Sequence, residues 1–447
     1  MPSAIARNAL RLSLAFVVSG LGVAGCAKSG SQGAPGDSPA GGDGGGGGGA
    51  DGTVGTSGPS HGADDGGGPI VLSEATVGGD ACQHFDVRFI PQIPLVFVLA
   101  DRSGSMFQRI STADGGTTNE WDPLRNATLS VINNLDSQVA FGFGAYTGIN
   151  PNTTPNMCPI LPNVPIALHN SQAIANLYLS LGDPTSMFKA ETPAQMSLEK
   201  VAQFLAQAAT AQTGASGGLP GGQYILFVTD GETDFCDDGN PVCPADAVIA
   251  EIQKLRLSSQ KIQTLILGLG SNLSNISGPV LQDFANAGAG LGTAAPPGSA
   301  AGLPLLPGDI YNQCSSVPGW HQLFTNAGLS PGQALGTYAP GTQATNAILY
   351  NPDPTNVMDL TNKIAAALKT VKSCSFDLQG KIKVDLTQAK KGQIAIDGTP
   401  LPYDATNGWT MASATQLDLV GTACQQWRAT GMNVTFDFPC DIIIFLQ

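Results

Sequence analysis

Apolar strands and amphipathic helices alternate through the central part of the chain. Continuous apolar runs, typical of strands buried on both faces of a parallel sheet, occur at residues 94–99, 139–146, 224–228, 262–267 and 347–350. Apolar residues also recur at helical spacing in the segments 122–135, 194–205, 248–255 and 360–371. This alternation predicts an α/β fold with a doubly wound, mostly parallel sheet over residues 82–372.

One stretch interrupts this alternation. Residues 288–346 are rich in Gly, Pro and Ala and lie between the apolar runs 262–267 and 347–350. An insertion of this length inside a compact domain is typical of a functional or a mobile segment. We therefore treat residues 288–346 as an insertion in the predicted α/β domain.

The pattern changes after Val371. The segments 382–386, 416–420 and 433–438 alternate apolar and polar residues with a period of two, and turn signals separate them. This pattern predicts a small antiparallel β domain at residues 373–447, of a size at which disulfides contribute to stability. Trp409 and Trp427 are expected in its core.

The N-terminus has the pattern of an export signal. Arg7 and Arg11 accompany an apolar stretch that is too short and too rich in glycine for a comfortable membrane span. It ends in Val-Ala-Gly-Cys26, which resembles the lipobox of bacterial lipoproteins. The resemblance implies a signal peptide at residues 1–25, lipid on Cys26 and, because Asp does not follow Cys26, the outer membrane. The alternative is an ordinary signal peptide with a chance cysteine.

A glycine-rich segment follows the predicted lipid anchor. Residues 30–69 contain 18 glycines in 40 positions and almost no large apolar side chain that could offset the entropy of ordering. Residues 26–69 are therefore predicted to be a lipidated cysteine and a disordered tether. Such a tether would hold the following domains away from a membrane surface in the cell envelope, facing the periplasm or the exterior.

The composition excludes two classes of protein. Lys and Arg number 20 against 34 Asp and Glu, a formal net charge of −14, so no basic surface for nucleic acid is expected. No uncharged apolar run of about 18 residues occurs after the N-terminus, which excludes a polytopic membrane protein. The lipid anchor is therefore the only membrane contact that the sequence predicts.

Eight cysteines remain after Cys26, an even number that in an exported protein predicts up to four disulfides. Proximity in sequence predicts Cys236–Cys243. The order of strands and helices predicts Cys82–Cys374 at the amino edge of the sheet and Cys158–Cys314 at the opposite edge. Cys424–Cys440 then remains, although Cys424 and Cys440 stay open as alternative partners of Cys82. No C-x-x-C pair and no histidine cluster supports a zinc or redox site.

Oxygen-bearing side chains follow two of the predicted strands. Asp101, Ser103 and Ser105 come directly after the run 94–99, and Asp230 follows the run 224–228. Carboxylate and hydroxyl oxygens are hard ligands that suit Mg²⁺, Mn²⁺ or Ca²⁺. The carboxyl ends of parallel strands meet at one edge of a sheet, which is where ligands bind in this class of fold.

These residues resemble a known motif set. Asp-x-Ser-x-Ser at 101–105, Thr192 before Pro193, and Val-Thr-Asp-Gly at 228–231 are similar to the metal-ion-dependent adhesion site of von Willebrand factor type A (VWA) domains, over residues 93–372. The resemblance implies that Ser103 and Ser105 bind a divalent cation directly, and that Asp101 and Asp230 bind it directly or through water. Thr192 would either bind the cation or withdraw from it as its loop moves. An Asp or Glu carboxylate of a partner protein would fill the open coordination position of the cation.

Each part of this motif has a structural alternative. Residues 101–105 could form a plain turn, and Thr192-Pro-Ala-Gln195 is also a helix capping box. The acidic loop 230–238 could hold a second cation, although a solvated loop closed by Cys236–Cys243 is favoured.

The residues favour a non-enzymatic, surface-tethered adhesion or interaction protein. An assembly subunit of an envelope complex that uses the same metal site is the alternative. An enzyme ranks third, because no nucleophile–base set, histidine cluster or small-molecule substrate site is evident.

Overall fold

The computed structural model describes most of the chain from residue 89 onward. The described residues are 89–112, 114–148, 158–185, 191–215, 221–231, 233–236, 241–269, 277–298, 303–339, 345–378, 382–429 and 433–445. The predicted signal peptide, Cys26, the tether and Cys82 lie outside them. Among the described residues, every helix is too short or too polar to span a lipid bilayer.

A five-stranded, mostly parallel sheet forms the centre of the α/β domain. Its order is β6 (Asn163–Ala167), β5 (Ala140–Tyr146), β2 (Leu95–Asp101), β7 (Gln223–Thr229) and β8 (Gln263–Gly268). All neighbours are parallel except β5 and β6. The predicted α/β fold with its mostly parallel sheet is confirmed.

One predicted strand does not form. In the run 347–350, only Tyr350 pairs with the sheet, in an isolated parallel bridge to Leu267. The run is short and Pro352 follows it, so the ladder of backbone hydrogen bonds cannot continue far.

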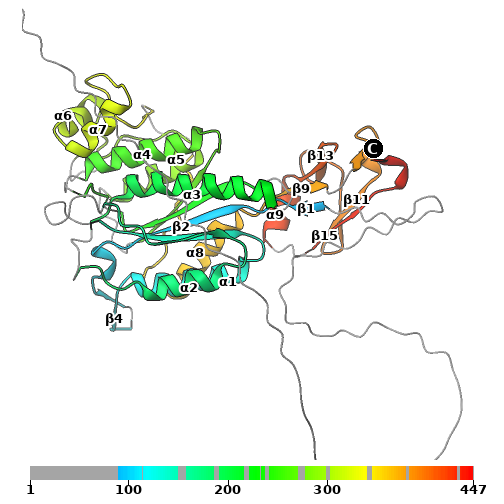
Figure 1. The fold of residues 1–447 in the computed structure, drawn as a ribbon, viewed down its shortest axis with the longest axis horizontal. Helices are drawn as coiled ribbons and strands as arrows, with labels where there is room; N and C mark the ends of the chain where they lie inside the picture. Colours follow the sequence, from blue (N-terminus) through cyan, green and yellow to red (C-terminus); the bar gives the residue numbers. More distant parts are fainter. Residues whose placement is uncertain are drawn as a thin grey trace, which may run out of the picture. The chain divides into compact units, whose positions relative to one another are not determined.

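Helices cover both faces of the sheet (Figure 1). Along β2, alternate side chains face opposite ways, so that Val96 and Val98 pack in one apolar cluster and Leu95 and Phe97 in the other. The helices of the first face are α1 (Trp121–Leu135), α2 (Ser171–Ser180) and α8 (Val357–Lys369). Those of the second face are α3 (Ala194–Ala215), α4 (Val242–Leu257) and α5 (Ser277–Ala289).

The insertion 288–346 carries two helices that the sequence pattern did not reveal, α6 (Pro307–Cys314) and α7 (Pro318–Asn326). Both contact α4. They share an apolar cluster with the start of α4 in which Trp320 and Cys314 are fully buried. The described part of the insertion therefore has a small core of its own, built against α4.

Asp246 of α4 organises this core. It is fully buried. Trp320 Nε1 donates to its Oδ2 at 2.7 Å, and the backbone N–H groups of Leu335 and Gly336 donate at 2.9 Å each. The Tyr338 hydroxyl donates to Oδ1. Burial raises the pKa of Asp246 above its usual value, while these hydrogen bonds oppose the rise.

The C-terminal domain consists of small antiparallel sheets around a shared core. One sheet has the order β1 (Phe89–Pro91), β9 (Ser375–Leu378), β14 (Gln416–Leu419) and β13 (Trp409–Ser413). A second contains β12 (Thr399–Leu401), β11 (Gln393–Ile396) and β15 (Val434–Asp437), and a third pairs β10 (Ile382–Val384) with β16 (Ile443–Phe445). As predicted, Trp409 and Trp427 are buried in the core.

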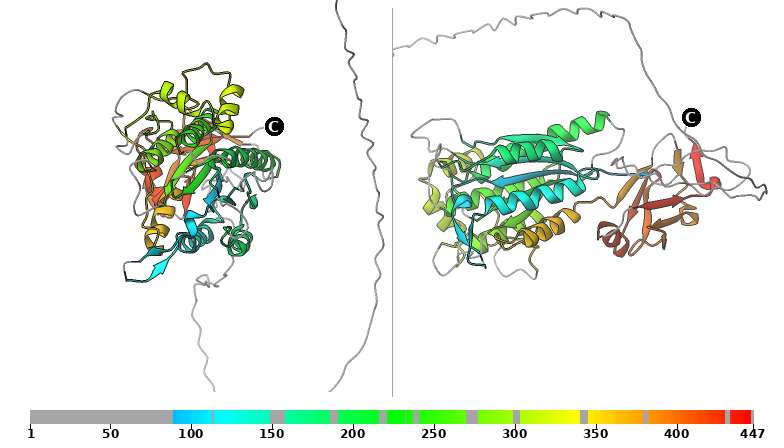
Figure 2. Two further views of the ribbon diagram at one scale, coloured as in Figure 1. Left: turned by 90° about the vertical axis from the view of Figure 1, so that its left-hand side faces the viewer. Right: turned by 90° about the horizontal axis from the view of Figure 1, so that it is seen from below.

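Strand β1 precedes the α/β domain in sequence yet pairs with β9, which follows that domain. The chain therefore passes between the two domains twice, before β2 and after α8 (Figure 2). The Gln92 side chain reinforces the pairing, because its Nε2 donates to Asp377 Oδ2 at 3.1 Å. Both ends of the α/β domain are thus anchored to one small sheet.

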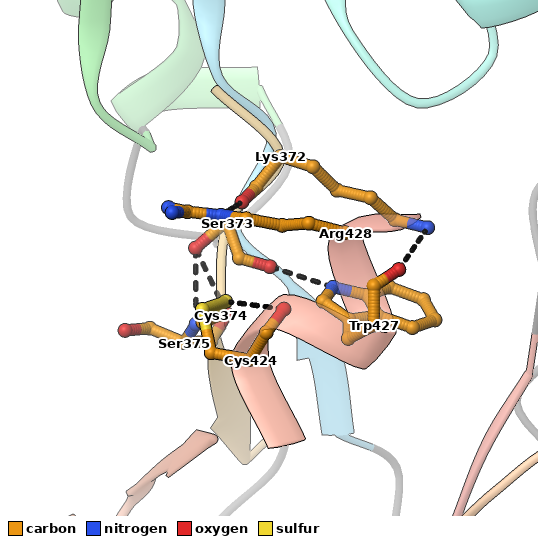
Figure 3. Close-up of a disulfide and its surroundings, with 7 residues drawn as sticks. All are labelled: Lys372, Ser373, Cys374, Ser375, Cys424, Trp427 and Arg428. Carbon is orange, nitrogen blue, oxygen red and sulfur yellow. Dashed lines mark hydrogen bonds between the residues drawn. A yellow bond between two sulfur atoms is a disulfide. The ribbon is translucent and has the colours of Figure 1, made fainter. Parts of the chain in front are cut away.

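The disulfide Cys374–Cys424 closes this junction, with its Cα atoms 5.5 Å apart (Figure 3). Cys424 lies on α9 (Thr422–Ala429), a helix absent from the predicted pattern. Trp427 Nε1 of the same helix donates to Ser373 O at 2.8 Å, and Lys372 Nζ lies 3.5 Å from the centroid of the Trp427 ring. Burial lowers the pKa of Lys372 to about 8.

All four predicted disulfides are wrong, since the structure forms Cys158–Cys236, Cys243–Cys314 and Cys374–Cys424. Cys82–Cys374 and Cys424–Cys440 fail because α9 brings Cys424 to Cys374. Cys236–Cys243 and Cys158–Cys314 fail because Cys243 begins α4 and faces the buried Cys314 of α6, which leaves Cys236 to the loop of Cys158. The distance between cysteines in the sequence did not show which way each cysteine side chain points.

Candidate metal centre

Asp101 is the last residue of β2 and is fully buried. The Ser103 backbone N–H donates to its Oδ1 at 2.7 Å. The hydroxyls of Thr229 and Tyr146 donate to Oδ2 at 2.9 and 3.1 Å. Thr229 ends β7 and Tyr146 ends β5, the two strands that flank β2. Asp101 is therefore held by the ends of the two strands that flank β2.

The two serines of the loop after β2 lie beside each other. Ser103 is buried and Ser105 is exposed, and their Oγ atoms are 2.9 Å apart. Ser105 begins a short 3₁₀ helix, η1 (Ser105–Phe107). Of the alternatives for this loop, the turn is present, because the bond from Ser103 N–H to Asp101 is an Asx-type turn bond. The same turn leaves both hydroxyls close together at the strand end.

Asp230 follows β7 at the same edge of the sheet, because β2 and β7 are neighbouring parallel strands with Ala100 opposite Val228. Burial and then the charge of Asp230 raise the pKa of Asp101 to about 7. Two acids are thus brought together at this edge, Asp101 fully buried and Asp230 half-buried.

Thr192 lies immediately before α3 and is tied to the loop after β7. Its N–H donates to Asp234 Oδ1 at 2.8 Å, and the Asp234 N–H donates to Thr192 O at 3.1 Å. The capping box does not form, because the Thr192 N–H donates to Asp234 and the Gln195 Nε2 donates to Glu251 Oε2 at 3.5 Å. The Thr192 hydroxyl makes no hydrogen bond to any described residue.

The disulfide Cys158–Cys236 supports the same loops. A Cβ placed on Gly148 would lie 2.6 Å from Cys236 Sγ, 3.1 Å from Glu191 Cβ and 3.3 Å from Pro193 Cδ. Gly148 must therefore stay without a side chain so that the cystine can pack against the segment that carries Thr192. Gly148 and Glu191 also exchange backbone hydrogen bonds.

Arg102, the basic residue of the loop after β2, does not neutralise these acids. Its guanidinium Nε and Nη2 donate to Gly182 O at 2.9 and 2.7 Å, just beyond the end of α2. Burial lowers its pKa. The positive charge is therefore directed at a backbone carbonyl.

Glu120 is a residue of this edge that the sequence analysis missed. It is 8% exposed, and its Oε2 has no hydrogen-bond partner among the described residues. Burial, then the charge of Asp230, then that of Asp101 raise the pKa of Glu120 to about 8. Nothing in the sequence pattern indicated it, because it follows a hairpin of β3 (Ile110–Ser111) and β4 (Thr117–Thr118).

The donor set fits a hard divalent cation. It offers buried carboxylates and adjacent hydroxyls and no soft ligand, the chemistry that suits Mg²⁺, Mn²⁺ or Ca²⁺. The Oε2 atom of Glu120 is a buried acceptor that no described residue satisfies, which fits a cation at this edge. Within the described residues, no three His, Cys, Asp or Glu side chains form a metal-holding group by themselves.

The strand-end residues are thus brought to one edge, with Thr192 attached through Asp234. Burial raises the pKa of Asp234 to about 8. The charges of Glu191 and Asp101 add to this rise, so Asp234 interacts electrostatically with the acid that ends β2. Phe235, the next residue, is buried in the apolar cluster of the insertion. The insertion therefore packs against the loop that holds Thr192.

Comparisons with known proteins give only distant likenesses. No protein-family model matches the chain, and no curated protein matches its sequence. The solved structures that resemble it include three proteins at 13% identity. They are the pilus adhesin SpaC from Lactobacillus rhamnosus GG (TM-score 0.35, covering 74% of this chain and 38% of that one), the PilB minor pilin from Streptococcus sanguinis (TM-score 0.30, 48% and 57%) and the SpRpn10 VWA domain (TM-score 0.27, 50% and 95%). The chain spans less than half of SpaC, and scores this low decide nothing about function.

Proposed function

We propose that this protein is a surface-tethered, non-enzymatic adhesion or interaction protein whose α/β domain binds a partner carboxylate through a divalent cation. The observation that supports it most is the convergence of Asp101, Ser103, Ser105 and Asp230 at the carboxyl ends of two adjacent strands. Mg²⁺ is the expected cation, with Mn²⁺ or Ca²⁺ as substitutes.

In this proposal the Ser103 and Ser105 hydroxyls are direct ligands, and the carboxylates of Asp101 and Asp230 bind directly or through water. Thr229 and Tyr146 hold Asp101 in place by donating to its Oδ2. Thr192 supplies a hydroxyl that is not hydrogen-bonded to any described residue. A bound cation supplies a Lewis-acidic position at which an Asp or Glu side chain of a partner protein can bind.

The cell-envelope location rests on the sequence. Lipid on Cys26 and the glycine-rich tether would hold the domains at a membrane surface, with the outer membrane favoured by the residue after Cys26. The alternative function, assembly of an envelope complex, uses the same cation and differs in whether the partner belongs to the same cell.

Chelation tests the proposed function directly. The full chain should capture a partner from envelope extracts, or from foreign cell surfaces, in Mg²⁺ and lose it in a chelator. Capture only from envelope extracts would favour the assembly subunit over the adhesin. Equal capture with and without chelator would contradict the proposal.

Substitution tests the residues. Asp101→Ala should abolish cation-dependent capture while leaving the circular dichroism spectrum unchanged. Because this change also removes the acceptor of Thr229 and Tyr146, Ser105→Ala is the milder variant, since Ser105 is exposed and its hydroxyl bonds, among the described residues, only to that of Ser103. Asp404→Ala, in an exposed turn of the C-terminal domain, is the control and should bind as the wild type does.

Anchoring has its own experiment. Cys26→Ser should release the protein from membranes or stop its N-terminal processing. Unchanged membrane partition together with normal trimming would exclude the lipoprotein assignment, without affecting the cation site. Turnover in a broad panel of hydrolase substrates would instead support an enzyme.

A further inference from the structure

Glu120 lies next to the loop that carries Ser103 and Ser105, because a β-hairpin between them brings the chain back. After η1 the chain leaves in the β3–β4 hairpin and then returns, so that the Glu120 N–H donates to Met106 O at 3.1 Å. Met106 is fully buried directly after Ser105. The hairpin therefore places an acid, fifteen positions away in sequence, against the loop that carries the two serines.

The Glu120 side chain has no structural task among the described residues. It occupies the N-cap position of α1 but makes no capping bond. The Asn119 side chain takes that role, accepting from the Asp122 N–H at 2.8 Å. The helix α1 begins at Trp121, directly after Glu120. A buried carboxylate that neither caps nor pairs is unusual, since buried polar groups are normally hydrogen-bonded.

The groups that act on Glu120 are themselves acids. The charges of Asp230 and Asp101 both disfavour its ionised form. Burial of one carboxylate beside two others is costly unless a positive charge compensates them. Arg102, the nearby base of the loop after β2, is bonded to Gly182 O. A cation bound between these acids would compensate all three.

We propose that Glu120 is a further cation-binding residue of this site, holding the divalent cation directly or through one of its waters. This inference rests on the proposed function, because it assumes a cation beside Asp101 and Asp230. With Glu120, three negative charges act on the ion instead of two, although the three carboxylates do not form a metal-holding group by themselves. The third charge increases affinity for the cation and makes its binding the step that relieves the repulsion among the acids.

Calorimetric titration of the full chain with MgCl₂ and with MnCl₂ at about 0.15 M salt tests this inference. Glu120→Gln keeps the shape of the side chain and removes its charge. Residues that orient a metal or its waters typically contribute 10–100-fold to affinity, so Glu120→Gln should weaken cation binding by roughly that factor. Glu120→Asp, which keeps the charge on a shorter side chain, should recover part of the loss.

Asp122→Asn is the matched control. It removes the same charge two residues away on the same helix, where Asp122 pairs with Arg125 and is half exposed. Screening by salt should keep its effect on cation affinity within about twofold. Equal weakening by Glu120→Gln and Asp122→Asn, or no weakening by Glu120→Gln, would overturn the role of Glu120 and leave the proposed function intact. A wild-type chain that binds neither cation would overturn both.

Discussion

Two buried acids of the α/β domain, Asp246 and Glu120, have opposite surroundings. Asp246 accepts hydrogen bonds from Trp320, Tyr338 and two backbone N–H groups of the insertion. Glu120 is almost as buried, yet its Oε2 has no described partner and the charges that act on it are negative. The first acid is saturated by hydrogen bonds from the protein, and the second is the acid that we propose binds the cation.

This difference separates a structural from a functional acid. A buried carboxylate with several donors holds segments together, and its removal leaves those donors unpaired. A buried carboxylate without donors destabilises the protein by itself, and a protein tolerates such groups chiefly at functional sites. The two acids should therefore respond to substitution in opposite directions.

The largest effect is expected for Asp246→Ala. The change leaves the Trp320 indole N–H, the Tyr338 hydroxyl and two backbone N–H groups without their acceptor, so stability should fall by about 3–5 kcal/mol. Urea or thermal unfolding of the full chain measures it. Asp309→Ala is the control, because Asp309 is an exposed acid of α6 whose side chain accepts one long backbone bond, and the change should cost about 1 kcal/mol or less. A loss of stability below about 1 kcal/mol for Asp246→Ala would show that the hydrogen bonds to Asp246 do not hold the insertion in place.

Asp283 of α5 is the intermediate case. It is 5% exposed and accepts one bond, from the Ala294 N–H at 2.9 Å, in the wall of a cavity of about 770 Å³ between α5 and the insertion. Burial raises its pKa from 3.8 to about 7. Because the folded pKa is the higher one, its contribution to stability is full below about pH 4 and is lost as the pH rises toward 7, by at most ~1.4 kcal/mol per pH unit.

The variant Asp283→Asn isolates this contribution, because Asn Oδ1 can still accept from Ala294. The stability of Asp283→Asn relative to the wild type should increase between about pH 4 and pH 7, by up to about 3 kcal/mol. Unfolding in urea at several pH values measures the difference. A constant difference over this range would show that burial does not raise the pKa of Asp283 in the folded protein.

The smallest effect is expected for Glu120→Gln without a cation. The change removes an acid that is buried beside Asp101 and Asp230, so the chain in chelator at pH 8 should become more stable, by about 1–2 kcal/mol. The gain is partial because the Gln amide is buried without partners as well. Thermal unfolding in chelator measures it, and a clear loss of stability would mean that Glu120 is structural like Asp246.

The strands of the α/β domain were predictable because of their apolar content. The runs at β2, β5, β7 and β8 are buried on both faces, and nothing but a central sheet accommodates such runs in sequence order. The polar residues that end β2 and β7 could be placed at one edge for the same reason. The helices α6 and α7 were missed because their segments are short and rich in Gly and Pro, and they form only against α4.

The cysteine pairing shows the limit of such reasoning. Topology placed Cys374 at the amino edge of the sheet, but its partner depends on α9, which returns Trp427 to Ser373. Likewise Cys243 lies only seven positions after Cys236 in the sequence, yet it is in the first turn of α4, which contacts α6. A disulfide needs Cα atoms roughly 4.4–6.8 Å apart, and the sequence does not contain that distance.

The sequence by itself determined the alternating α/β pattern, the polar ends of two adjacent strands and the separate β pattern after residue 373, because hydrophobic periodicity is a local property. Only the tertiary structure decided that Asp246 is saturated, that Glu120 returns to Met106 beside Asp101 and Asp230, and which cysteines meet. These features depend on donors, charges and sulfur atoms brought together from distant segments, and burial strengthens or penalises each of them according to its neighbours.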